Sequence, residues 1–278
     1  MKIWSGIGMM LISMLFSATA TAADMRLLTK MDFPPYITDT RDDGGILTRI
    51  VRAALDEEHL DLQIELDSWS SAYKRVAHRQ ALGTYAWAYP QRPEQFYISA
   101  PIFTNRWYFY SNRSVLQHID DLDYVGRTAR LCLPQGWSRA PRVNSLLRDR
   151  KVELVAAKDL RGCLQWLLDG RVDMIRSTPL MLASAEAIFS EYPASAALIA
   201  RGLNRLEDTV VQQHSGYVLF SRDRAGRVAR DRFNRGLKQL ISSGRYEQLI
   251  RAAIVPFRYE YRMQVVQALQ HAGFMQRH

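Results

Sequence analysis

The most constraining feature of this chain is an alternation of strand-like and helix-like segments that runs through it twice. In each run, apolar residues at every second position give way to apolar residues at helical spacing, and the pattern then returns. Such alternation is typical of a parallel sheet with helices packed on its faces. Two consecutive runs therefore predict an α/β fold with two lobes.

The expected elements follow from these patterns. In the first run the strands are expected at 25–31, 62–69 and 85–89 and the helices at 46–55 and 71–82. In the second run the strands are expected at 125–133, 152–156 and 172–175 and the helices at 138–150 and 160–168. Further strand-like segments lie at 107–110 and 216–220, and further helices are expected at 227–242, 246–253 and 258–271, with the docking of the last helix left open.

The N-terminus has the composition of an export signal. Lys2 precedes an apolar stretch at 3–16 and a run of small residues at 17–23. Ala20 and Ala22 occupy the two positions that a signal peptidase reads, so residues 1–22 are predicted to be a cleaved signal peptide. The alternative is a membrane anchor, but the apolar stretch is shorter than the roughly 20 residues that a spanning helix needs.

Export bears on the two cysteines, Cys132 and Cys163, which are the only ones in the chain. In an oxidising compartment such a pair tends to be bridged, and we expect a structural disulfide. Two buried free thiols are the alternative.

The charge pattern limits the partners. The formal net charge is +9, and all but six of the 37 basic residues are arginines. A basic chain raises nucleic acid as a partner, but these arginines are scattered, no nucleic-acid motif is present and export removes the protein from such targets. A solvated basic surface is the simpler interpretation. The six histidines have no metal-ligand spacing, and there is no phosphate loop or serine elbow, so we expect no metal, no cofactor and no catalytic residue.

Four segments together resemble one protein family. They are 83–102, 167–173, Pro34-Pro35-Tyr36 and Gly44-Gly45, and they are similar to the family 3 extracellular solute-binding proteins, the polar amino-acid receptors of bacterial importers. The resemblance spans nearly all of the chain after residue 22. It implies a type II periplasmic-binding-protein-like fold, in which each lobe is a mainly parallel sheet flanked by helices and segments 107–110 and 216–220 cross between the lobes as hinges. The implied organisation is a first lobe at 23–109 and 217–257, a second lobe at 110–216 and a helical tail at 258–278.

Candidate ligand contacts lie just after the strands, because ligands of open α/β sheets bind beyond the carboxyl ends of strands. The set expected to bind the solute is Asp32, Phe33, Trp69, Tyr85, Trp87, Arg92, Ser138 and Thr178, with 134–138 and 176–178 as the loops of the second lobe. The resemblance implies that Arg92 clamps a ligand carboxylate; a surface arginine in a loop is the alternative. Ser138 begins a helix, where it would cap the helix and also favour an anion. The aromatic residues would stack on the ligand or simply pack in the core.

Two positions depart from the amino-acid-binding pattern. Thr178 falls where the family has an acidic residue that pairs with the ligand ammonium, and Tyr85 falls where it usually has aspartate. Losing an ammonium partner would leave a buried charge unpaired. Asp32 is a possible substitute, and a carboxylate ligand without an amine is the other interpretation.

The sequence therefore predicts a monomeric periplasmic protein that captures a small polar solute, bearing a carboxylate and related to amino acids, for an ABC-type importer. Two alternatives stay open. One is a periplasmic enzyme on the same scaffold, similar to a dehydratase of cyclic carboxylates. The other is a sensor or partner-binding protein without a role in transport.

Overall fold

The structure is a computed structural model that describes residues 23–39, 41–137, 139–184, 189, 203–206, 212–257 and 259–276. The predicted signal peptide lies outside these ranges. Within them, no helix combines the length and the apolar character that crossing a membrane requires.

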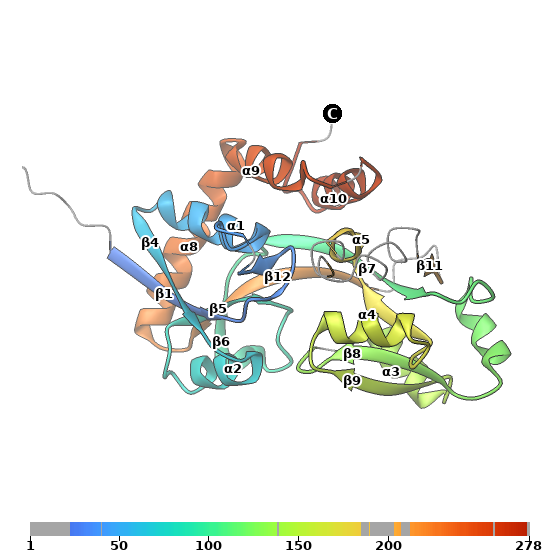
Figure 1. Cartoon of the computed structure of the whole chain (residues 1–278). Helices are drawn as coiled ribbons and strands as arrows, with labels where there is room; N and C mark the ends of the chain where they lie inside the picture. Colours follow the sequence, from blue (N-terminus) through green and yellow to red (C-terminus); the bar gives the residue numbers. More distant parts are fainter. Residues whose placement is uncertain are drawn as a thin grey trace, which may run out of the picture.

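One long mixed sheet runs through the molecule in the strand order β4-β1-β5-β12-β7-β10-β8-β9 (Figure 1). Its strands are β4 (Leu60–Leu66), β1 (Ala23–Thr29), β5 (Gly83–Trp87), β12 (Gln212–Ser221), β7 (Phe103–Ser111), β10 (Met174–Ser177), β8 (Ala129–Pro134) and β9 (Val152–Ala157). Shorter strands are β6 (Phe96–Ile98) on β12, β11 (Asn204–Arg205) on β7, and the separate pair β2 (Asp32–Phe33) and β3 (Ile37–Thr38). The antiparallel strands β7 and β12 lie between the two parallel groups, as expected of hinge crossings.

The first parallel group carries α1 (Ile46–Asp56) and α2 (Trp69–Ala77), and β1 pairs in parallel with β4 and β5. A 3-10 helix, η1 (Pro93–Gln95), follows β5. The predicted strand at 62–69 is wrong at its end. The hydroxyl oxygen of Ser68 accepts a hydrogen bond from the amide of Ser71 and caps α2, so Trp69 is the first helical residue.

The second parallel group has β8 between β9 and β10 and carries α3 (Pro141–Arg148), α4 (Leu160–Leu168) and α5 (Pro179–Ala183). The predicted strand at 125–133 is wrong at its start. A 3-10 helix, η2 (Ile119–Val125), ends at that position, and Gly126 follows in the left-handed region with φ 73°. The strand therefore begins only at Ala129.

In the described part of the chain three helices follow β12, and the first two of them pack on α1 of the first group. They are α8 (Arg224–Ser242), α9 (Arg245–Ile254) and α10 (Tyr259–His271). Helix α8 packs on α1 so closely that a Cβ added to Gly236 would lie 1.9 Å from the carbonyl oxygen of Ala54. Helix α10 instead contacts β7 and α5, which places the tail beside the crossing strands and the second group (Figure 1). The predicted lobe limits at 109/110 and 216/217 fall within β7 and β12, which both groups share.

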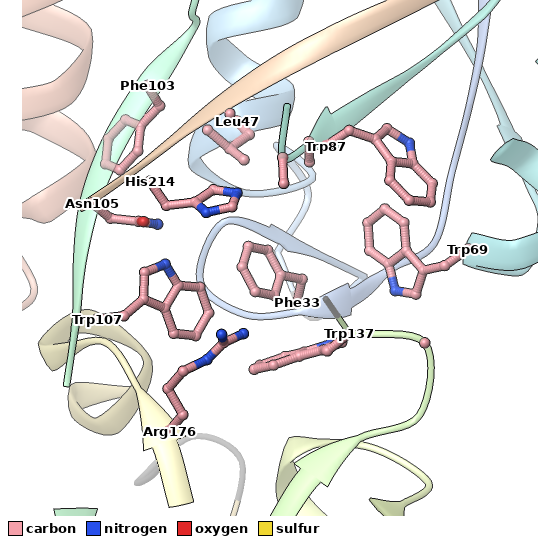
Figure 2. A pocket seen from close by; sticks show the side chains of 14 residues that line it. Phe33, Leu47, Trp69, Trp87, Phe103, Asn105, Trp107, Trp137, Arg176 and His214 are labelled. Atoms are coloured by element: carbon pink, nitrogen blue, oxygen red, sulfur yellow. The ribbon is translucent and has the colours of Figure 1, made fainter. Parts of the chain in front are cut away.

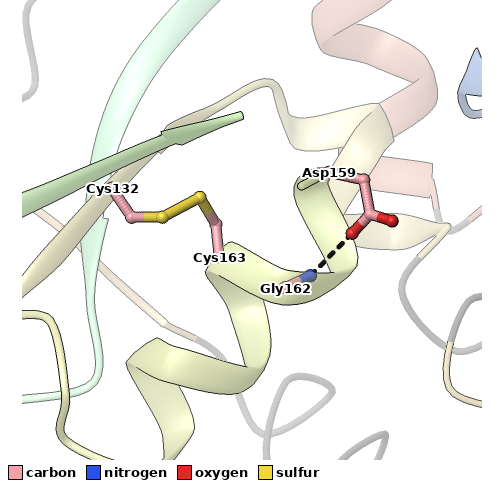
Figure 3. Close-up of a disulfide and its surroundings, with 4 residues drawn as sticks. All are labelled: Cys132, Asp159, Gly162 and Cys163. Carbon is pink, nitrogen blue, oxygen red and sulfur yellow. Dashed lines mark hydrogen bonds between the residues drawn. A yellow bond between two sulfur atoms is a disulfide. The ribbon is translucent and has the colours of Figure 1, made fainter. Parts of the chain in front are cut away.

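The expected disulfide is present between Cys132 on β8 and Cys163 on α4, with the two Cα atoms 5.6 Å apart (Figure 3). Helix α4 begins beside it, where the Asp159 carboxylate accepts a hydrogen bond of 2.8 Å from the amide of Gly162. The bridge therefore ties the buried face of α4 directly to the sheet.

Reducing this disulfide is expected to lower the free energy of unfolding by about 2–4 kcal/mol. The bridge joins cysteines 31 positions apart, and it lowers the conformational entropy of the loop between them in the unfolded chain. Urea unfolding with and without dithiothreitol measures the effect. A Cys132→Ala/Cys163→Ala variant is the control, because reductant should not change its stability. Equal stability of the wild type in both conditions would contradict the prediction.

The segment 170–173 has a structural role in the second group. Asp173 is fully buried, and its carboxylate accepts hydrogen bonds from Arg127 at 2.8 and 3.1 Å and from the amide of Arg130 at 2.7 Å. Arg113, just beyond β7, forms an ion pair with it at 3.0 Å. One carboxylate thus joins the ends of β7, β8 and β10.

Candidate ligand-binding site

A cavity of about 160 Å³ lies where β5, β7, β10 and β12 meet β2 and the turn that follows β8 (Figure 2). It is lined by Phe33, Leu47, Trp69, Ala86, Trp87, Ala88, Phe103, Asn105, Trp107, Gly136, Trp137, Arg176, His214 and Gly216. These residues come from both parallel groups and from the two crossing strands. The cavity is therefore at the position that the fold favours for a ligand, beyond the carboxyl ends of β5 and β8.

The crossing strands supply one wall through their side-chain alternation. Phe103, Asn105 and Trp107 are every second residue of β7, so they share a face of the strand. On β12, His214 lies opposite Asn105, and Gly216 lies opposite Phe103. This register brings one imidazole and one carboxamide to the same part of the cavity (Figure 2).

A tight turn supplies the next wall. The amides of Ile46 and Leu47 donate hydrogen bonds to the carbonyl oxygens of Pro35 and Tyr36, at 3.1 and 2.8 Å. Gly45 precedes them at φ 93°, and a Cβ there would lie 2.7 Å from the carbonyl oxygen of Tyr36. Only glycine allows this approach of α1 to the turn, which holds Phe33 and Leu47 against the cavity.

Aromatic side chains dominate the lining and form two groups (Figure 2). In one, the ring of Trp137 lies edge-on to those of Phe33 and Trp107, with centroids 5.4 and 5.5 Å apart. In the other, Trp69 and Trp87 are perpendicular at 5.4 Å. These are the separations at which aromatic rings attract one another, and all of these side chains except Trp107 remain partly exposed.

Arg176 is the charged group of the lining. It is only 3% exposed, and its guanidinium carbon lies 4.8 Å from the ring centroid of Trp107. Burial lowers the pKa of Arg176 from 12.5 to about 10, so the side chain stays protonated at neutral pH. A cation in an apolar, aromatic cavity attracts an anion far more strongly than an exposed arginine does.

His214 lies close to this charge. Burial and, second, the charge of Arg176 lower the pKa of His214 from 6.5 to about 4. The imidazole is therefore neutral at physiological pH, and its polar nitrogens can serve as a hydrogen-bond donor and acceptor.

The lowered pKa of His214 predicts a loss of stability in mild acid. As pH falls through 6.5 the unfolded chain binds a proton at this residue, whereas the folded protein does so only near pH 4. The free energy of unfolding should drop by about 1–2 kcal/mol between pH 7 and pH 5 from this group. Urea unfolding at both pH values measures it, and His214→Gln should lack this contribution. The exposed His78, changed to Gln, is the control that should leave the pH dependence as it is.

The structure places three of the sequence-predicted residues in the lining: Phe33, Trp69 and Trp87. Two others lie elsewhere. Tyr85 is fully buried with its hydroxyl 3.1 Å from that of Thr48, and burial raises its pKa to about 12. The hydroxyl of Thr178 caps α5 and lies 3.0 Å from the hydroxyl of Tyr36. Both side chains are part of the packed interior around the cavity.

Arg92 is exposed at the start of η1 and does not belong to the lining. Its expected contact with a carboxylate stays a prediction, and the structure puts Arg176 at the cavity instead. Ser138 lies outside the described residues, as does the side chain of Asp32.

The sequence-based predictions did not include Asn105 or His214. They placed Trp107 only in an expected hinge strand and Arg176 only within the candidate loop 176–178. Two signals were available. Phe103, Asn105 and Trp107 form a period-2 set that leads into the expected hinge at 107–110, and Arg176 directly follows the apolar residues Met174 and Ile175. A charge inside a buried strand is rare unless it has a partner or a function.

Solved structures of similar fold were found, whereas no protein-family model matches the chain and no curated protein matches it in sequence. An ancestral arginine-binding protein bound to arginine has 15% identity and a TM-score of 0.65, over 84% of this chain and 98% of that one. The probable amino-acid ABC transporter extracellular-binding protein ytmK from Bacillus subtilis has 15% identity and a TM-score of 0.64, over 82% and 96%. A histidine kinase sensor domain with similarity to periplasmic binding proteins has 15% identity and a TM-score of 0.64, over 85% and 98%.

These neighbours are mostly binding proteins, and they include the amino-acid receptors whose motifs the sequence resembles. At such low identity the likeness establishes the fold and no ligand. Each of the three chains is covered almost completely. The chain has the two-lobed α/β fold of the periplasmic binding proteins.

Proposed function

We propose that this protein is a periplasmic solute-binding protein that holds a small anionic solute, with its carboxylate on Arg176, in the cavity between the two parallel groups. The single observation that carries the proposal is the buried, protonated Arg176 in an aromatic cavity at the crossing strands. In a low-dielectric site, bidentate hydrogen bonds from a guanidinium to a carboxylate are strong and selective.

The position of the cavity supports a binding role. Residues from β5 and α2 face residues from the turn after β8, and a Cβ added to Gly136 would lie only 3.8 Å from the Cβ of Trp69. A ligand in contact with both sides would favour the arrangement that brings them together. Delivery to an inner-membrane ABC importer is the further part of this proposal, and it is supported by the transporter-associated neighbours.

The test is a thermal-shift screen of the purified protein with pairs of solutes that share a skeleton but differ in charge, such as butanoate with butylamine and benzoate with benzylamine. A ligand at about 100 times its Kd should stabilise the folded protein by about 2.7 kcal/mol. For a chain of this size that corresponds to a rise in Tm of about 5 °C or more. Carboxylates should produce the rise and amines should not. A panel in which no anion raises Tm would sink the proposal, and consumption of a bound carboxylate would reassign the protein as an enzyme.

A further inference from the structure

We propose that the solute is a carboxylate with a single aromatic ring and no ammonium group. This inference rests on the proposed function, because it concerns what the same cavity selects. It separates the protein from receptors of standard amino acids.

The size and walls of the cavity indicate one ring. The volume is about 160 Å³. A closed apolar cavity of about 150 Å³ in another protein binds benzene, so the space here suits one six-membered ring. Phe33 and Trp137 lie on one side of the cavity and Trp69 and Trp87 on another, so a planar ligand can meet both faces and edges of aromatic rings (Figure 2).

The polar groups are gathered at one end of the site. Arg176, His214 and Asn105 project from β10, β12 and β7 beside Trp107 (Figure 2). Arg176 supplies the charge, and the neutral His214 and Asn105 supply hydrogen-bonding groups. A ring with its carboxylate on a short arm matches this division between an aromatic part and a cationic end.

Among the lining side chains that the structure describes, a set that leaves out Asp32, none offers a counter-charge to a ligand ammonium group, because none of them is Asp or Glu. Arg176 already disfavours a proton on His214, and the same positive potential acts against a ligand ammonium. The hydroxyl of Thr178 is engaged with Tyr36 and with the amide of Met181, and it lies outside the lining. Desolvating an ammonium next to a fixed cation is strongly unfavourable.

The experiment is isothermal titration calorimetry with three probes. 3-Phenylpropanoate and L-phenylalanine differ only in the α-ammonium group, and butanoate keeps the carboxylate but lacks the ring. We expect 3-phenylpropanoate to bind at least about 100-fold tighter than L-phenylalanine. We expect it to bind at least about 10-fold tighter than butanoate, because only the phenyl ring can be buried against the aromatic walls.

A variant separates the ring contribution from the carboxylate contribution. Phe33→Leu should reduce the ratio of the affinities for 3-phenylpropanoate and butanoate, and Trp87→Leu is the second variant in case the first does not fold. Tyr124→Leu is the control, because Tyr124 is 78% exposed on η2 and outside the lining, and it should leave the ratio unchanged.

The outcomes distinguish the two proposals. Binding of L-phenylalanine as tight as that of 3-phenylpropanoate overturns the exclusion of an ammonium, and equal binding of butanoate overturns the ring; in both cases a carboxylate-binding protein remains. An unchanged ratio in both aromatic variants also overturns the ring. Failure of every carboxylate in the screen and in the titrations removes the proposed function together with this inference.

Discussion

Arg176→Met is expected to weaken the binding of any carboxylate in the cavity by at least about 100-fold. The guanidinium is nearly inaccessible to water and lies over the ring of Trp107, so its attraction for an anion is little screened. Methionine keeps a long unbranched side chain but has no charge and no N–H donor. Titration calorimetry with the tightest carboxylate from the screen measures the change.

Arg171→Met is the matched control for this substitution. Arg171 also lies over an indole, with its guanidinium carbon 4.6 Å from the ring centroid of Trp166, but it is exposed and outside the cavity lining. The same chemical change there should leave the affinity unaltered. If Arg176→Met binds the carboxylate as tightly as the wild type does, or if both variants lose affinity equally, Arg176 does not hold the anion.

Asp173→Asn is expected to reduce the free energy of unfolding by about 3–5 kcal/mol. The carboxylate is fully buried and is paired with both Arg127 and Arg113, so the amide would leave two guanidinium groups without their counter-charge. The substitution keeps the shape of the side chain, which limits other effects. Urea unfolding followed by circular dichroism measures the loss.

Asp169→Asn provides the comparison, because Asp169 is an exposed aspartate that directly follows α4. Its carboxylate is at the surface and accepts a hydrogen bond from Gln165 one helical turn before it. The expected loss is about 0.5 kcal/mol or less. At a temperature where the Asp173→Asn variant is still folded, this variant should bind a carboxylate ligand as tightly as the wild type does, because Asp173 lies outside the cavity lining. Equal stability of the two variants would show that the buried ion pairs contribute little.

The helices and strands could be predicted from local sequence patterns, but the residues at which they begin and end could not. The period-2 and helical spacings located the strands and helices of both α/β units, because each pattern reports which face of a short segment is buried. The observed ends differ from the predicted ends where a capping side chain or a glycine determines the local backbone conformation. Ser68 caps α2 and thereby makes Trp69 helical, and Gly126 separates η2 from β8.

The candidate site was predictable only in part. Phe33, Trp69 and Trp87 follow directly from their place after or near strand ends, and the structure puts them in the lining. Arg92 was favoured because it lies in the motif of the family. Arg176 was included only within the candidate loop 176–178, because nothing local indicates which cavity a buried strand residue will face.

The sequence by itself determined the α/β alternation and its repetition, because both depend on local periodicity. It also determined that any disulfide within the chain joins Cys132 to Cys163, because these are its only two cysteines. Tertiary structure alone decided the cavity. The residues that line it are spread along the sequence between positions 33 and 216, and the pairing register of β7 and β12 places His214 opposite Asn105. Burial then lowered the pKa values of Arg176 and His214. Desolvation and the approach of distant charges arise only when the chain is packed, so no spacing along the sequence encodes them directly.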